Sequence, residues 1–165
     1  STATGGLMVI YGIDPGFSGA IAIYETGLSW GKMRVYDMPI MKSAKGKTIL
    51  NLSEILNILQ PEDPHHNLAV IEQVGAMPNQ GVSSTFRFGQ GFGQLQMAIA
   101  AQKLPVQYVT PQKWKSHFGL SRDKGVSRSV AMQRFPEIAD QFKRVKDDGR
   151  AEAALIALYG REKLI

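Results

Sequence analysis

The sequence predicts an α/β fold in which a five-stranded mixed sheet carries helices on its faces. Three apolar runs rich in β-branched residues occupy the first third of the chain, at about 8–14, 19–25 and 33–38. Two further apolar runs, at 68–72 and 105–109, are separated by segments with helical spacing. Strands followed by alternating helices and strands are typical of a sheet covered by helices.

Apolar spacing and end signals place the helices. One helix is expected at 50–59, where apolar residues recur at helical intervals and Pro61 lies beyond the end. Another is expected at 86–100, because Ser83–Thr85 is good N-cap material and large apolar residues follow it. Three more helices complete the chain, at about 111–117, 125–135 and 148–163.

The length of 165 residues predicts one domain, which we expect over 8–165. The opening Ser1–Gly6 is small and polar, as in a tag remnant or a disordered terminus. Cysteine is absent, so disulfides and thiolate metal sites are excluded. No apolar stretch approaches a membrane span and no secretory signal is evident, so we expect a cytoplasmic protein with no membrane partner.

Positive charge is concentrated in one segment. Residues 103–150 hold eleven Lys or Arg against five acids, a net charge of +6, whereas the rest of the chain carries −1. A basic segment beside an acidic pocket suits a nuclease, because cations hold phosphates and acids hold metal ions. A solvated helical surface is the alternative, so charge alone leaves nucleic-acid binding open.

Two segments resemble nucleotide-binding motifs without meeting their requirements. Met41–Thr48 ends like a P-loop, but that motif needs glycine where Met41 stands, so we expect a flexible basic loop. Gly89–Gln94 has a third glycine one position early for a dinucleotide fingerprint, and no strand leads into it. Its glycines are better suited to close packing of another helix or backbone. We therefore expect no nucleotide cofactor.

Four acidic residues stand where a divalent-metal site needs them. Asp14 and Glu72 each end an apolar strand, and Asp148 and Glu152 share a helix face at i, i+4 spacing. Phosphodiester hydrolysis needs an activated water and neutralisation of the leaving oxygen, and two Mg²⁺ ions about 4 Å apart supply both. Because Mg²⁺ binds through a few carboxylates plus water and phosphate, the four acids are candidate catalytic residues and metal ligands.

Each acid also has a structural explanation. Asp14-Pro15-Gly16 is an ordinary turn sequence, and Glu72 could be the first solvated residue after its strand. Asp147 fits an N-cap, and Asp148 could complement the helix dipole. Glu152 is hardest to explain in this way, because it interrupts a small and apolar helix face where a carboxylate needs a partner. Each structural explanation is adequate for its own residue, but together they explain the set of four acids poorly.

Several segments, in order along the chain, resemble the RuvC family of Holliday-junction resolvases. They are Ile13–Gly16, Ile71–Val74, Leu104–Val106 and the terminal Asp148-x-x-x-Glu152-Ala153. Two more segments, Asp37–Pro39 and Gly81–Phe86, are most similar to the short phage-borne members. The resemblance covers about residues 8–160, and the order and separation of the motifs together make it specific.

The resemblance implies a ribonuclease-H-like nuclease domain that acts as a homodimer on four-way DNA junctions in a bacterial or phage-infected cell. It implies paired symmetric nicks that depend on two Mg²⁺ ions per active site, with Mn²⁺ as a substitute. Asp14, Glu72 and Glu152 match the family's metal-binding acids. Asp148 matches the remaining acid in members that place it four residues before the last one, and Asp147 is its rival.

The resemblance also assigns DNA-contacting residues. Lys115 and Lys124 match basic residues that the family uses near the scissile phosphate, so both are candidate catalytic residues. Many members wedge an aromatic into the junction centre, where this chain has Gly75, and Met77 is the candidate substitute. The helix at 86–100 is the expected dimer interface, with plain core packing as the alternative. The full set of candidate DNA-binding residues is Met77, Lys113, Lys115, Arg122, Lys124, Arg128 and Lys146.

Three other functions compete with junction resolution. A less selective nuclease for branched, forked or flapped DNA would share the metal chemistry and differ in how it reads substrate shape. Actin-like sugar kinases share a Gly-x-Asp-x-Gly loop but need two domains and far more chain. A catalytically inactive DNA-binding module would gain nothing from four carboxylates facing phosphates, so the retained acids argue against it.

Overall fold

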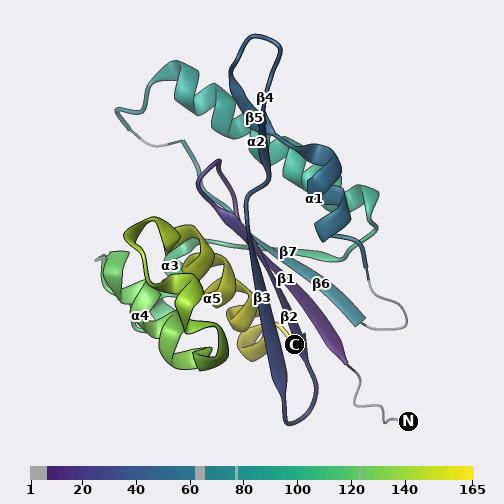
Figure 1. The fold of residues 1–165 in the computed structure, drawn as a ribbon, viewed down its shortest axis with the longest axis vertical. Coiled ribbons are helices and arrows are strands. Elements are labelled where there is room, and N and C mark those ends of the chain that lie inside the picture. Colours follow the sequence, from purple (N-terminus) through teal and green to yellow (C-terminus); the bar gives the residue numbers. More distant parts are fainter. Residues whose placement is uncertain (1–6, 62–65, 77, 123) are drawn as a thin grey trace.

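A five-stranded mixed sheet forms the centre of the molecule, in the order β3-β2-β1-β6-β7 (Figure 1). The first three strands pair antiparallel, whereas β6 and β7 run parallel to β1. The computed structural model describes residues 7–61, 66–76, 78–122 and 124–165. The strands are β1 (Met8–Asp14), β2 (Ala20–Thr26), β3 (Gly31–Asp37), β6 (His66–Glu72) and β7 (Val106–Val109).

Helices cover both faces of the sheet (Figure 1). On one face, α1 (Leu52–Ile58) and α2 (Val82–Ala101) contribute Ile55, Leu95 and Ile99 to a core with Ile13 and Ile71. The opposite face carries α3 (Pro111–His117), α4 (Lys124–Arg134) and α5 (Asp148–Lys163). The expected five-stranded mixed sheet with flanking helices is confirmed.

Helix α5 lies unusually close to the sheet. Ten of its residues are buried, and most of them are small or aliphatic. Gly12 in β1 makes this approach possible, because a Cβ there would overlap the backbone of Ala153 and Ala157. A Cβ at Gly149 would likewise overlap the carbonyl oxygen of Ser18, in the turn between β1 and β2. The backbones of α5, β1 and this turn therefore fix one another's positions.

Several local expectations were wrong. Residues 41–48 do not form a loop alone: they are part of a hairpin in which a turn at 43–47 joins β4 (Ile40–Lys42) to β5 (Thr48–Leu50). Helix α2 begins at Val82 with Gly81 as its N-cap, and residues 83–85 lie inside it. Strand β6 begins at His66, two residues before the apolar run at 68–72 that predicts it.

Short 3-10 helices were not foreseen. They are η2 (Pro136–Phe142) and η3 (Val145–Asp147), and they connect α4 to α5. Among the residues that the structure describes, no helix combines the length and apolar character needed to cross a membrane. The expectations for residues 1–6, for Met77 and for the side chain of Lys124 lie outside the described part of the chain.

Candidate active site

Two of the candidate acids are aligned by the sheet. Ile13 of β1 pairs in parallel register with Ile71 of β6, so Asp14 and Glu72 stand side by side as the next residue of each strand. Their strand positions alternate with Ile13 and Ile71, which face α1 and α2, so both carboxyl groups face α5. Both are nearly buried, with 8% of Asp14 and 6% of Glu72 exposed.

Helix α5 brings the third carboxylate to this place. Glu152 precedes Ala153, the residue that packs against Gly12, and its side chain forms a hydrogen bond with Asp14. Lys115 of α3 completes the group, with Nζ 3.8 Å from Glu152 Oε1. Three acids and one lysine from four separate parts of the chain thus meet at one edge of the sheet.

The electrostatics of the group reflect crowding of like charges. Burial, followed by the neighbouring charges of Glu152 and Glu72, raises the pKa of Asp14 well above its usual range, and Lys115 opposes this only in part. Burial also raises the pKa of Glu72, again reinforced by Glu152. An uncompensated cluster of this kind is costly to ionise, so it favours a bound cation.

The buried side chain of Trp114 contacts two residues of this group. Trp114 is fully buried, and its indole Nε1 donates a 2.6 Å hydrogen bond to Oε2 of Glu72. This bond opposes the rise in the pKa of Glu72. Nζ of Lys115 lies 5.5 Å from the centroid of the same indole ring. Trp114 therefore contacts both Glu72 and Lys115 and helps to position them.

Asp148 is engaged by a different partner. It lies one turn before Glu152 on α5, but its Oδ1 is 3.4 Å from Nε of Arg128. Neither of these two buried atoms makes a hydrogen bond to any group that the structure describes. The i, i+4 spacing still places Asp148 on the helix face that carries Glu152.

Asp147, the rival of Asp148, has a structural role. It is 1% exposed and accepts hydrogen bonds from both the backbone N–H and the side chain of Arg144. Burial alone would raise the pKa of Asp147, but Arg144 outweighs it and lowers this pKa. Arg150 lies 3.7 Å away and also binds Asp37 through two hydrogen bonds. The position of Asp147 as the N-cap of α5 is confirmed, but its side chain serves this ion-pair network.

The donor set suits a hard divalent cation, although it is not a closed cage. Within the described ranges, no three Asp, Glu or His side chains are arranged to hold a metal ion. The carboxyl oxygens of Asp14, Glu72 and Glu152 are nevertheless the ligand type that Mg²⁺ and Mn²⁺ prefer. Burial, with repulsion from Glu152 and Glu72, raises the pKa of Asp14, and a cation bound between these carboxyl groups would relieve the repulsion. In donor type and charge, but not in their present arrangement, these residues therefore fit a divalent metal ion.

The candidate DNA-binding cations divide into two kinds. Lys113, Arg122 and Lys146 are exposed. Arg128 is half-buried and donates to the carbonyl oxygen of Lys143 at 2.8 Å, so its contacts lie within the protein. Lys115 is also half-buried and belongs to the acidic group.

Trp114 is the site residue that sequence reasoning missed. It stands between two lysines in a short helix, a setting that suggests solvent exposure rather than a buried donor. One signal could have found it. Trp114 is a large apolar side chain among the polar residues of α3, so it must face the core, and a buried indole N–H needs an acceptor.

No family model and no curated protein matches the chain. Solved structures do match. RuvC from Thermus thermophilus is 17% identical with a TM-score of 0.56, covering 93% of this chain and 96% of that one. The same organism's RuvC in complex with Holliday junction substrate is 16% identical with a TM-score of 0.54, covering 94% and 96%. The fowlpox virus Holliday junction resolvase is 19% identical with a TM-score of 0.52, covering 96% and 100%.

These similarities extend over nearly the full length of both partners. The ribonuclease-H-like fold expected from the motifs is confirmed, as is the resemblance to the RuvC family at the level of the fold. At such low identity the similarity concerns the fold, and the chemistry has to be argued from the residues of the site.

Proposed function

We propose that this protein is a metal-dependent endonuclease that resolves four-way DNA junctions by paired symmetric nicks. The observation that carries the proposal is the meeting of Asp14, Glu72 and Glu152 beside Lys115. It occurs in a fold whose solved examples include a resolvase in complex with Holliday junction substrate. Acidic side chains without a bound cation would repel the phosphates of DNA, whereas a bound metal ion would offset this repulsion.

In this proposal Asp14, Glu72 and Glu152 hold the metal, and Asp148 joins them after leaving Arg128. Two Mg²⁺ ions, when bound, supply an activated water and neutralise charge on the leaving oxygen. The protein contributes rigid placement, because two of the acids are fixed by strand register and the third by the close packing of α5. Trp114 keeps Glu72 oriented and favours its ionised form.

Lys115 has a second proposed role, at the phosphate. Its ammonium is half-exposed while remaining within 3.8 Å of Glu152, so it can also reach an anion at the carboxylate group. A cation there would offset the repulsion between the acids and an approaching phosphate. Lys113, Arg122 and Lys146 supply exposed positive charge for the flanking backbone, and Lys124 is proposed to act with them.

We place a homodimer interface on the outer surface of α2. Val82, Phe86 and Met97 are 87%, 69% and 66% exposed there, an unusual set of apolar side chains for one helix facing solvent. A Cβ at Gly89 or Gly93 would meet nothing within the described chain, so the helix has room for another backbone. A two-fold dimer would present two acidic groups to a junction, as paired nicks require.

The decisive experiment incubates the protein with a synthetic four-way junction, with and without Mg²⁺. The expected result is a pair of nicked duplexes, formed only with metal and through cuts at symmetric positions. Asp14→Asn should bind the junction without cutting it, and undiminished cutting by this variant would contradict the metal-site assignment. Forks and flaps serve as competing substrates: faster cutting of these than of junctions would favour a less selective branched-DNA nuclease.

A further inference from the structure

The β4–β5 hairpin is a basic ribbon that the proposed chemistry leaves unused. Its two strands pair through Ile40–Leu50, Met41–Ile49 and Lys42–Thr48. The turn that joins them is closed by hydrogen bonds from the Ser43 N–H to the Lys47 carbonyl and from the Gly46 N–H to the Ser43 carbonyl, both at 2.8 Å. Gly46 has a φ of 78°, which favours glycine at this position. The hairpin is thus an ordered element with a defined tip.

Three lysines project from this ribbon. Lys42, Lys45 and Lys47 are all exposed, and within the part of the chain that the structure describes no carboxylate forms an ion pair with any of them. Lys42 instead donates to the hydroxyl of Thr48 across the strands at 2.9 Å. A group of lysines without carboxylate partners at the end of a projecting element is the arrangement expected of a surface that contacts a polyanion.

The base of the ribbon is anchored firmly. Leu50 is buried in the core beneath α2, and the N–H of Asn51 binds the carbonyl of Pro39 at 2.9 Å. Arg87 of α2 donates to the backbone carbonyl of Thr48 and lies over the ring of Phe17, 4.8 Å from its centroid. Phe17 belongs to the turn that follows Asp14. Arg87 therefore connects the hairpin to the loop beside the acidic group.

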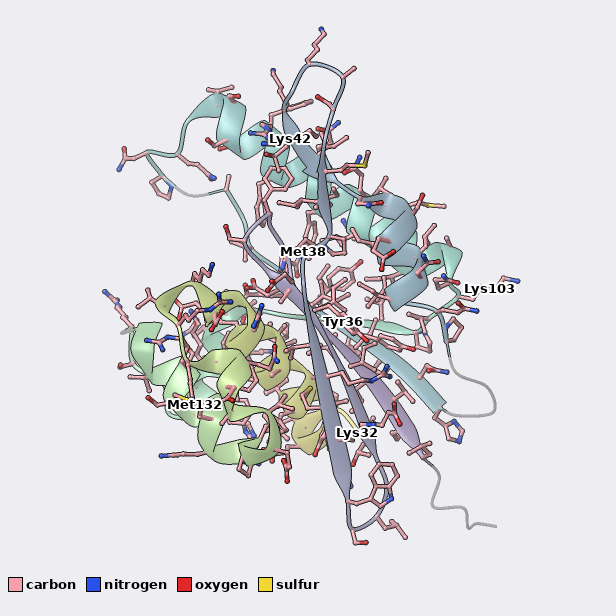
Figure 2. The ribbon with its side chains drawn as sticks, in the orientation of Figure 1. Lys32, Tyr36, Met38, Lys42, Lys103 and Met132 are labelled. Atoms are coloured by element: carbon pink, nitrogen blue, oxygen red, sulfur yellow. The ribbon has the colours of Figure 1, made fainter. Side chains whose placement is uncertain are left out.

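The hairpin and two of the other candidate DNA cations, Lys115 and Arg122, belong to opposite faces of the sheet, whereas Lys146 lines the same cavity as Ile40 at the base of the hairpin. The hairpin is anchored on the sheet face that carries α1 and α2, whereas Lys115 and Arg122 belong to the face that carries α3 and α4. Figure 1 shows the ribbon extending past the end of the sheet where the β1–β2 turn lies. In Figure 2, Lys42 lies on this extension, and Lys32 lies near the opposite end of the molecule.

We infer that the β4–β5 hairpin is a second DNA contact, which binds the phosphates of a duplex arm away from the cut. The inference rests on the proposed function, since it needs DNA at the acidic group. A two-stranded ribbon is narrow enough for the major groove, whose walls carry phosphates within reach of lysine side chains. DNA held at Lys115 on one side and at the ribbon on the other would cross the carboxylates between them.

A matched pair of triple variants tests the inference. Lys42→Gln, Lys45→Gln and Lys47→Gln together remove three charges from the ribbon. Lys32→Gln, Lys103→Gln and Lys163→Gln remove the same charge from exposed positions elsewhere. Each phosphate contact contributes about 0.9 to the salt slope, so the ribbon variant should lose up to about 2.7 from it. The ratio of wild-type affinity to ribbon-variant affinity should then fall by up to about 40-fold as the salt concentration rises from roughly 50 to 200 mM. The control variant should show the salt dependence of wild type.

Further readouts separate a DNA contact from other roles. Replacing the same three lysines with arginine should restore affinity, and the cutting rate at saturating protein should stay near wild type in every variant. Shortening the junction arms should weaken wild-type binding until it equals that of the ribbon variant. Equal losses in both glutamine variants, or dissociation of a dimer by the ribbon variant alone, would overturn the inference.

The outcomes also distinguish this inference from the proposed function. If wild type cuts junctions and the ribbon variant binds them as wild type does, only the hairpin contact is wrong. If wild type fails to cut any junction while the ribbon variant still loses affinity for a plain duplex, the hairpin contact stands and the resolvase proposal falls.

Discussion

Trp114 and Glu72 are joined by a 2.6 Å hydrogen bond from the indole N–H to a carboxylate oxygen, and both side chains are shielded from solvent. The tryptophan is 42 residues distant in sequence, so the bond is a product of the fold. It opposes the effect of burial on the pKa of Glu72. The acid thereby stays closer to the ionised state that a metal ligand requires.

Replacing Trp114 with Phe tests this bond while keeping most of the ring volume. Loss of the donor should raise the pKa of Glu72 further, so the acid limb of the cleavage rate against pH should move to higher pH. Unfolding free energy should fall by about 1–3 kcal/mol, because a buried acceptor loses its partner. Trp30→Phe is the control, since Trp30 is 51% exposed in the turn after β2. An unshifted acid limb in Trp114→Phe would contradict the positioning role.

Asp14 should make stability depend on pH in an unusual direction. Its pKa is raised in the folded chain, so the folded state binds this proton more tightly than the unfolded state does. Its stabilising contribution is full below the ordinary aspartate pKa and is lost as pH rises toward the folded value. In metal-free buffer, Asp14→Asn should therefore melt at a higher temperature than wild type near neutral pH, and the difference should vanish in acid.

Mg²⁺ provides the complementary measurement. Added Mg²⁺ should raise the melting temperature of wild type and leave Asp14→Asn nearly unchanged, because only the native carboxylate group binds the ion. Asp140→Asn is the control, since the Asp140 side chain is 83% exposed and pairs only with Lys143 among the described residues. Equal stabilisation of all three proteins by Mg²⁺ would show that the ion binds elsewhere.

Asp147→Asn should damage stability rather than chemistry. The side chain is buried and bonded to Arg144, so its loss should cost about 2 kcal/mol in unfolding free energy. Because the folded pKa of Asp147 is lowered, its contribution is present above the ordinary aspartate pKa and is lost as pH falls through the folded value. Denaturant unfolding at two pH values measures both effects.

Asp148→Asn should show the opposite pattern. We expect cleavage to be lost while unfolding free energy changes by less than about 1 kcal/mol, because the side chain makes an imperfect ion pair with Arg128. Single-turnover cleavage of a junction by both asparagine variants makes the comparison. If Asp147→Asn lost activity without losing stability, the assignment of the two acids would have to be exchanged.

Lys115→Ala should weaken junction binding and reduce the salt slope by about 0.9, if the ammonium contacts a single phosphate. It should also raise the pKa values of Asp14 and Glu72, because Lys115 lowers both. Binding titrations over a range of salt concentrations measure the first effect, and the pH dependence of cleavage measures the second. Lys103→Ala, at the exposed end of α2, is the comparison and should change neither.

The strand-end acids could be read from the sequence because a local rule places them. An apolar run that stops at an acid puts the carboxylate at a strand terminus, and parallel pairing brings two such termini together. The helix at 148–163 was equally readable, because its small and apolar composition predicts a buried element. The individual elements depend on residues that are close together along the chain, and a general rule of strand pairing brings the two strand ends together.

The remaining features depend on residues that are far apart. The proposed preference for Asp148 over Asp147 rests on Arg144, which binds Asp147, and on the Arg150–Asp37 pair, whose members are 113 residues apart. The hairpin at 40–50 was missed because its basic turn has the composition of a loop, and its pairing shows only when Leu50 and Arg87 anchor it. Tertiary contacts thus overrode local composition at both places.

The pairing of Ile13 with Ile71 sets how the site can change during evolution. Inserting or deleting one residue in β1 or β6 would turn a carboxylate to the wrong face of the sheet, so these two positions cannot drift along the chain. The helix tolerates more change, because residues three and four positions before Glu152 both lie on the helix face that carries Glu152. Related proteins with this fold should therefore keep the two strand acids at fixed positions within their strands. The helical acid that precedes Glu152 should occur either three or four residues before it.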